Sequence, residues 1–228
     1  MTDIVFDRAD YARIRAAVAG LHHEALRLHN KSDIHACARH LGLLHKKTLV
    51  FEDESELAIL SAYQVYGYRP RGFNLAELYL RLNRQSLDEW RLELLKRMSA
   101  ARFAIMMVIA RDGVNALQVT VVLRTQTFTL VDEALSSSLT VNQAMAAHVV
   151  DLGGFCIQTG GVVPADRDLL QDDAPMRVLS AIYRKCEGKT FTVDTEDDAK
   201  LARAVMTAAI RLGYTERVRY SEDSSGDN

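Results

Sequence analysis

Residues 103–123 read FAIMMVIARDGVNALQVTVVL, an apolar run followed by a polar turn and a second segment in which apolar residues recur. Residues 103–110 are all apolar, and a run of this length that ends at a turn signal is typical of a strand. Asp112-Gly113 is a pair that favours a tight turn, and from Leu117 to Leu123 every second residue is apolar. We therefore predict a hairpin with strands at 103–110 and 117–123.

Three shorter segments of the same character follow this hairpin. They lie at 127–131, 145–152 and 155–158, and the turn pair Gly153-Gly154 separates the last two. Five short strands with tight turns favour closure, because a closed sheet has no exposed edges. The sequence thus predicts one compact antiparallel, barrel-like β unit over residues 102–163.

The segments before and after this unit have helical periodicity, with apolar residues at steps of three and four. Asp7, Ser32 and Asn74 are expected N-caps, and Ser86-Leu87-Asp88-Glu89 matches a capping box. The acidic residues from Glu52 to Glu56 are expected to begin a helix, whose N-terminus attracts negative charge. The first two helices are expected to pack against each other in antiparallel contact. The predicted helices span residues 7–29, 32–42, 57–66, 74–82, 86–100, 176–183 and 195–212.

These patterns predict an α+β fold in which mostly helical N-terminal and C-terminal parts flank the small antiparallel β unit. The expected organisation is a helical region at 1–101, the β unit at 102–163 and a C-terminal helical region at 164–220. Residues 221–228 contain no apolar side chain, and we expect a disordered tail there.

Composition excludes several classes of function. Lys and Arg number 28 against 30 Asp and Glu, a formal charge of −2, so no global field attracts a polyanion or a membrane. The N-terminus does not resemble a signal peptide, and the apolar run at 103–110 is far shorter than the ~20 residues of a membrane-spanning helix. The three cysteines, Cys37, Cys156 and Cys186, are odd in number and far apart, which indicates a reducing compartment. We expect a cytoplasmic protein that binds no membrane.

Four segments carry a resemblance to known proteins: residues 56–68 with three tyrosines, 100–103, 135–139 and 151–155. Over about residues 50–165 the chain resembles a group of uncharacterised bacterial proteins with helices and a small β barrel. Some members of that group carry a C-terminal zinc-binding SEC-C motif. This chain lacks the paired cysteines of that motif, so the resemblance implies a fold and not a zinc site.

Candidate catalytic and metal-binding residues do not form a recognisable pattern. Six histidines fall in the N-terminal part, but their spacing does not place pairs on one helix face with an acid. They are His22, His23, His29, His35, His40 and His45. We predict no structural metal and no cofactor. An alternative is an enzyme whose site assembles from dispersed residues, with a metal held by these histidines.

A nucleophilic site could also be sought at the serine run Ser136-Ser137-Ser138, with His148 as a base and Asp151 as its orienting group. No G-x-S-x-G motif supports it, and we interpret the run as a polar turn between strands.

A local excess of basic residues lies in the segment 69–102, which contains eight basic and four acidic residues. If they share a face, they could bind a protein partner or, as the weaker expectation, nucleic acid. The candidate partner-binding residues are Arg69, Arg71, Arg81, Arg84, Arg91 and Arg97. The leading expectation is a non-enzymatic binding or regulatory module, with weak nucleic-acid binding through this segment as a further alternative.

Overall fold

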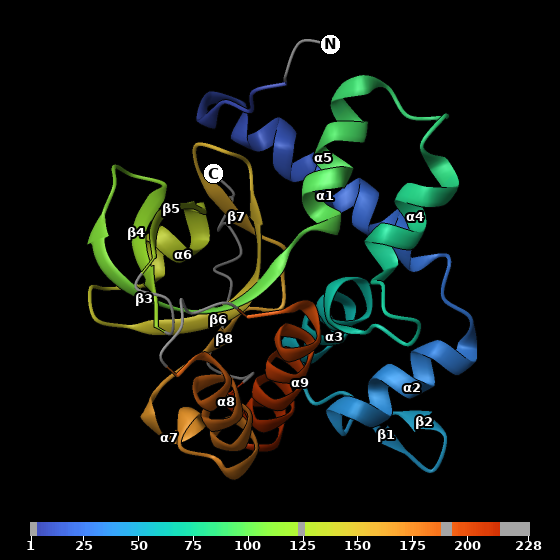
Figure 1. The fold of residues 1–228 in the computed structure, drawn as a ribbon, viewed down its shortest axis with the longest axis vertical. Coiled ribbons are helices and arrows are strands. Elements are labelled where there is room, and N and C mark those ends of the chain that lie inside the picture. The colour runs from blue at the N-terminus through green and yellow to red at the C-terminus, as the bar shows by residue number, and fades with distance from the viewer. Residues whose placement is uncertain (1–3, 123–125, 188–192, 215–228) are drawn as a thin grey trace, which may run out of the picture.

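Helices flank a small β barrel in the computed structural model, which describes residues 4–122, 126–187 and 193–214 (Figure 1). The helices before the barrel lie close to the predicted positions. They are η1 (Arg8–Asp10), α1 (Tyr11–Leu26), α2 (Lys31–Leu41), α3 (Glu54–Ala62), the π-helical turn η2 (Tyr63–Gly67), α4 (Leu75–Asn83) and α5 (Glu89–Ser99). The later helices are α6 (Glu133–Ser138), α7 (Arg167–Leu170), α8 (Asp173–Cys186) and α9 (Thr195–Arg211). The predicted α+β class is confirmed.

The barrel is a closed ring of five strands in the order β3-β4-β5-β7-β6, closed by pairing of β6 with β3. All five predicted strands are present, although the predicted end at Leu123 lies outside the described residues. The strands are β3 (Arg102–Arg111), β4 (Ala116–Val121), β5 (Thr127–Val131), β6 (Ala144–Asp151) and β7 (Cys156–Gln158), with the short β8 (Val163–Pro164) added on β6.

The prediction of a purely antiparallel unit is wrong, because β5 and β7 pair in parallel. The cause is the number of strands. Neighbouring strands can all run in opposite directions around a closed ring only if the number of strands is even. A ring of five strands must therefore contain a parallel pair. The helix α6 lies between β5 and β6 in the chain and allows β7 to enter beside β5.

From Phe103 to Met106 strand β3 is buried on both faces, which explains the start of its apolar run, whereas Ile109 near its end is 41% exposed. Alternate side chains of a strand point to opposite faces. Ala104, Met106 and Val108 therefore belong to the interior core of the barrel, whereas Phe103 and Ile105 face the helices. The same alternation in β6 directs His148 toward the helices, where its ring contacts Phe103.

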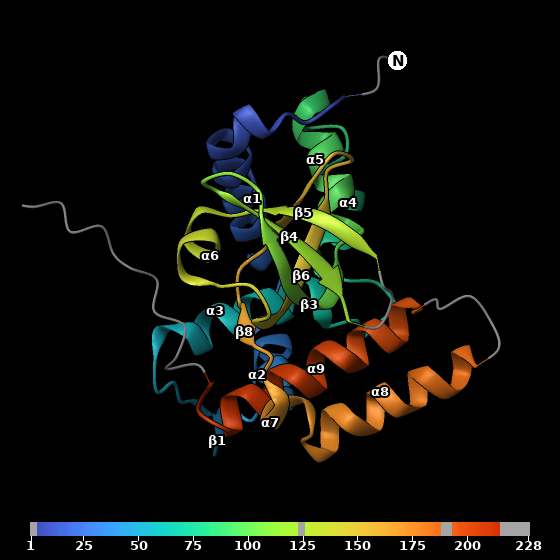
Figure 2. The same cartoon turned by 90° about the vertical axis from the view of Figure 1, so that its left-hand side faces the viewer.

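Two further cores lie between the barrel and the helices. One contains the buried faces of α1, α4 and α5, and the other those of α2, α3 and α9. The expected antiparallel contact of α1 with α2 is therefore wrong, since each helix buries its apolar stripe in a different core. Figure 2 shows α8 beside α9, along the side of the molecule opposite α5. The division into regions at 1–101, 102–163 and 164–220 stays a prediction.

Capping explains most of the helix boundaries. Asp7, Asn74 and the acidic start of α3 cap as expected, with Asp53 accepting hydrogen bonds at the α3 N-terminus. Two caps were predicted wrongly. Asn30, not Ser32, caps α2, and Asp88 caps α5 in place of the Ser86 capping box. In both cases the Asn or Asp immediately before the first helical residue accepts a hydrogen bond from a backbone N–H of the first turn.

Two local features differ from the sequence interpretation. The serine run forms the end of α6 and not a polar turn, and the Ser136 and Ser137 hydroxyl groups donate to backbone carbonyls. A small hairpin of β1 (Leu44–His45) and β2 (Thr48–Leu49) was not predicted, because its turn places Lys46 and Lys47 at positive φ, where glycine or asparagine is the usual signal.

None of the helices in the described part of the chain combines the length and the apolar character that a membrane crossing requires. The predicted tail at 221–228 lies outside the described residues.

Candidate ligand-binding site

A π-helical turn after α3 redirects the chain toward the surface. The Tyr68 N–H donates to the Tyr63 carbonyl oxygen at 2.8 Å, which closes this wide turn. Gly67 is required inside it, because a Cβ at this position would lie 2.6 Å from the Tyr63 ring. Turns of this type are frequent at functional sites. The chain then leaves in an extended conformation at Tyr68 and enters a loop that ends at Gly72, with φ of +82°.

The π-helical turn also fixes the connection between α1 and α2. Gln64 lies in the turn and is only 7% exposed. Its Oε1 lies 3.2 Å from Nδ1 of His29, and since Oε1 can only accept, the His29 Nδ1 carries the proton. The edge of the His29 ring also meets the Tyr68 ring, with centroids 6.0 Å apart. In the neutral ring the remaining nitrogen, Nε2, is therefore an acceptor.

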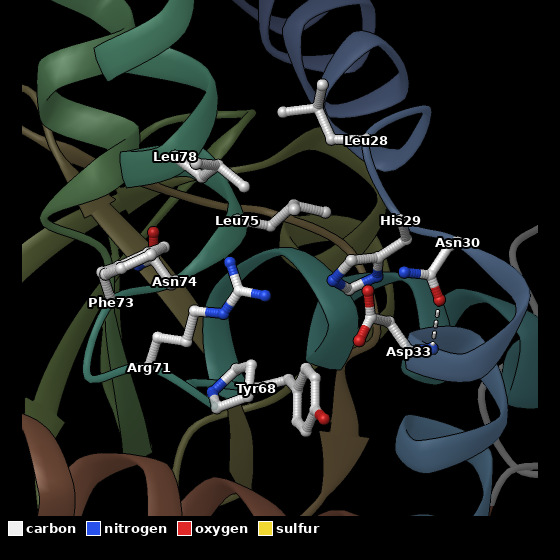
Figure 3. Close-up of a pocket in the computed structure, with 11 residues that line it drawn as sticks. Leu28, His29, Asn30, Asp33, Tyr68, Arg71, Phe73, Asn74, Leu75 and Leu78 are labelled. Carbon is white, nitrogen blue, oxygen red and sulfur yellow. Dashed lines mark hydrogen bonds between the residues drawn. The ribbon is translucent and has the colours of Figure 1, made fainter.

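A pocket of about 320 Å³ lies where α1, α2, the 68–72 loop and α4 meet (Figure 3). We name it the Arg71 pocket. Its lining consists of Leu28, His29, Asn30, Asp33, Tyr68, Pro70, Arg71, Phe73, Asn74, Leu75 and Leu78. The leucines form an apolar wall, whereas the polar groups gather on the side of α2 and the loop. A cavity of this size with an apolar wall and a few polar groups is typical of a small-molecule site.

Arg71 and Asp33 place opposite charges in this pocket. Figure 3 shows the Arg71 guanidinium group extending toward the centre of the pocket, with the His29 ring and the Asp33 carboxylate across from it. No ion pair within 4.0 Å joins the two charges, and in the described part of the chain neither side chain has another hydrogen-bond or ion-pair partner. Asp33 is held by the first turn of α2, where its backbone N–H donates to the Asn30 side chain at 3.0 Å.

The α4 N-terminus forms a rigid side of the pocket. The Asn74 side chain accepts from the Glu77 N–H, and the Glu77 carboxylate accepts from the Asn74 N–H, so the capping box is complete. The buried Asn74 amide also donates to the Ser99 carbonyl at the end of α5. Arg69 donates to Glu77 at 2.9 Å, which engages that guanidinium group within the protein.

A second pocket, of about 540 Å³, lies on the other side of the loop, and Tyr68 and Pro70 line both. We name it the α9 pocket, because Arg203 and other α9 residues form one of its walls. His40 lies 3.0 Å from the Tyr63 hydroxyl, and burial, followed by the nearby Arg203 charge, lowers the pKa of His40.

The predicted partner-binding arginines have different surroundings in the structure. Arg91 binds Glu24 of α1 at 3.1 Å, and Arg97 binds Glu93 at 3.1 Å. The Arg81 guanidinium lies over the Phe73 ring at 4.6 Å, and Arg84 is exposed. Of the six predicted residues, Arg69 and Arg71 line the pockets beside the loop.

The histidines do not assemble into a metal site within the ranges that the structure describes, where no group of three potential ligands comes together. His22 lies 2.6 Å from the Ser61 hydroxyl, and burial lowers its pKa to about 4. His29 and His40 line different pockets.

Sequence reasoning missed Asp33 and Gln64 as site residues. Asp33 lies three residues after the true cap Asn30, which looks like ordinary helix-start chemistry. Gln64 is embedded in an apolar segment, and nothing in the sequence signals that the helix widens there.

Comparison with known proteins places this fold in an uncharacterised group. Neither the curated proteins nor the solved structures show a significant match to the chain. A family model matches residues 7–170, which include the whole Arg71 pocket and the barrel. The chain therefore belongs to DUF7986, a family of unknown function.

Proposed function

We propose that this protein is a non-enzymatic binding or regulatory module that holds a small organic acid in the Arg71 pocket. The observation that carries the proposal is the Arg71 guanidinium, which extends into a defined cavity without an internal partner among the described residues (Figure 3). A guanidinium group offers two parallel N–H donors that match a carboxylate. The leucine wall supports a ligand that also carries an apolar group.

The same contacts argue against the alternatives. The pocket lining contains no Ser, Thr, Cys or Lys side chain, so a covalent catalytic step there would have to use Asp33, His29 or Tyr68. Nucleic-acid binding through the basic segment is disfavoured because Arg69, Arg91 and Arg97 already bind acids of this chain. Each such pair leaves one charge fewer for phosphate groups.

A cytoplasmic location and kinship with the bacterial group that includes SEC-C members belong to the same proposal. Cys37 and Cys156 are buried and form no disulfide, which is the expected state in a reducing compartment.

Binding of 4-methylpentanoate and L-leucine tests this function. Both carry a carboxylate and the same branched alkyl group, and calorimetry on the full chain should detect at least one of them. Arg71→Ala should weaken the detected binding about 10-fold or more, whereas Arg84→Ala, which removes an exposed arginine outside the pocket, should leave it unchanged. Equal affinity of the wild type and the Arg71→Ala variant would refute the proposal.

A further inference from the structure

The Arg71 pocket contains an anionic group as well as a cationic one. Asp33 presents its carboxylate on the same side of the cavity as the His29 ring, as Figure 3 shows. Like Arg71, it has no hydrogen-bond or ion-pair partner for its side chain among the residues that the structure describes. A simple organic acid would engage Arg71 alone and would bring its own negative charge toward Asp33, at an electrostatic cost.

His29 adds a second acceptor beside Asp33. Its Nδ1 is committed to the buried Gln64, so the neutral ring offers the Nε2 lone pair. A primary ammonium group has three N–H donors and no acceptor, and it therefore needs a carboxylate and further lone pairs around it. Asp33 and His29 together meet that need, whereas Arg71 cannot accept a hydrogen bond.

The geometry of the pocket thus has three chemically different parts. Arg71 suits a carboxylate, the pair of Asp33 and His29 suits an ammonium group, and the wall that contains Leu75 and Leu78 suits an apolar side chain. An α-amino acid carries these three groups on a single carbon atom. The cavity of about 320 Å³ is at the small end of ligand sites, which fits a molecule of that size.

We infer that the ligand of the Arg71 pocket is a zwitterion, namely a free α-amino acid with an apolar side chain. This inference rests on the proposed function and specifies its ligand class. The carboxylate of the amino acid accepts from the Arg71 guanidinium, its ammonium group donates to the Asp33 carboxylate and to His29 Nε2, and its side chain contacts the leucine wall.

The test compares probes that differ by one charged group. L-Leucine carries both charges, 4-methylpentanoate lacks the ammonium group, and 3-methylbutylamine lacks the carboxylate. L-Alanine and L-phenylalanine vary the side chain at constant charge. Calorimetry on the full chain should show at least one of the three amino acids binding, and leucine binding about 10-fold or more tightly than either singly charged analogue.

Two variants identify the groups responsible. Asp33→Asn removes the charge but keeps the backbone N–H that Asn30 caps, so α2 retains its N-terminal contact. It should weaken leucine about 10-fold or more and abolish the preference for leucine over 4-methylpentanoate. Glu54→Gln removes an exposed acid from the first turn of α3, outside the pocket, and should change nothing. Melting temperatures verify that each variant is folded.

The outcomes separate this inference from the proposed function. If 4-methylpentanoate binds as tightly as leucine and Arg71→Ala abolishes both, the zwitterion is wrong and the acid-binding function stands. If Asp33→Asn binds leucine more tightly, Asp33 competes for Arg71 and the inference is also wrong. If the wild type binds none of the amino acids or analogues, both are refuted.

Discussion

His148 is a buried base whose charge state couples stability to pH. Its side chain in β6 is completely buried, with the Phe103 and Tyr66 rings at centroid distances of 5.1 and 5.6 Å. Neither ring nitrogen has a hydrogen-bond partner among the described residues. Burial lowers the pKa of His148 to about 3, and the positive charges of Arg69 and His22 add to this effect.

The sign of the pH effect follows from that depression. In the unfolded chain histidine binds a proton below a pKa of about 6.5, whereas the folded chain keeps His148 neutral until about pH 3. His148 therefore costs no stability through protonation above about pH 6.5, and it destabilises the fold progressively as the pH falls toward 3, because only the unfolded chain binds the proton. On transfer from pH 7.5 to pH 5.0, the pH falls about 1.5 units below the pKa of histidine in the unfolded chain. Over that interval the unfolding free energy falls by about 2 kcal/mol.

His148→Leu should remove this dependence. A leucine fills a similar volume beside the two rings and has no proton to bind, and it also removes two buried nitrogens without partners. We expect the variant to be at least as stable as the wild type at pH 7.5 and to lose about 2 kcal/mol less on transfer to pH 5.0. Urea unfolding at both pH values measures this difference.

A second buried histidine, His22, also contributes to the pH dependence of stability, so the wild type must be compared with the His148→Leu variant. Burial also lowers the pKa of His22, to about 4, so the variant keeps part of the pH dependence. Only the difference between the wild type and the variant isolates His148. His45→Leu replaces an exposed histidine and should show the wild-type pH dependence. If His148→Leu and the wild type lose the same stability between the two pH values, the reasoning is wrong.

Four further predictions concern packing, capping, metal and charge. Gly161→Ala should lower the unfolding free energy, measured with urea, by more than about 2 kcal/mol, because its Cβ would lie 2.9 to 3.0 Å from atoms of α3. In the control Gly160→Ala, the new Cβ meets no atom within 4 Å, so only the strain of the positive φ remains, about 1 kcal/mol. Asn74→Ala should lower the unfolding free energy by about 2–3 kcal/mol, because it removes the α4 cap and the hydrogen bond to the end of α5. Asn30→Ala, which removes an exposed cap, should lower it by about 1 kcal/mol. A chelator should leave the melting temperature unchanged, and a fall of several degrees would reveal a structural metal. Fluorescence anisotropy with single-stranded RNA and duplex DNA at 150 mM salt should detect no submicromolar binding, and a submicromolar affinity that depends on the basic segment 69–102 would contradict this expectation.

Local patterns in the sequence predict the barrel because they depend on neighbours along the chain. The apolar run predicts strand β3, and Gly153-Gly154 marks the turn into β7. The parallel pairing of β5 with β7 does not follow from any single segment. It follows from the closure of five strands, which is a property of the whole ring.

The candidate site is less predictable because its parts come from separate elements. Arg71 could be identified as a basic residue near a glycine turn, but the sequence does not show that Glu77 binds the neighbouring Arg69 and not Arg71. Arg91 finds its acid, Glu24, 67 residues away on another helix. A count of bases and acids within one segment therefore cannot show which charges remain available to a ligand.

A crystal structure of the full chain with L-leucine tests the central claim most directly. The account predicts the amino acid in the Arg71 pocket, with its carboxylate on the Arg71 guanidinium and its ammonium group between Asp33 and His29. Leucine bound elsewhere, or an unliganded pocket in which Arg71 forms an ion pair with Asp33, would contradict it.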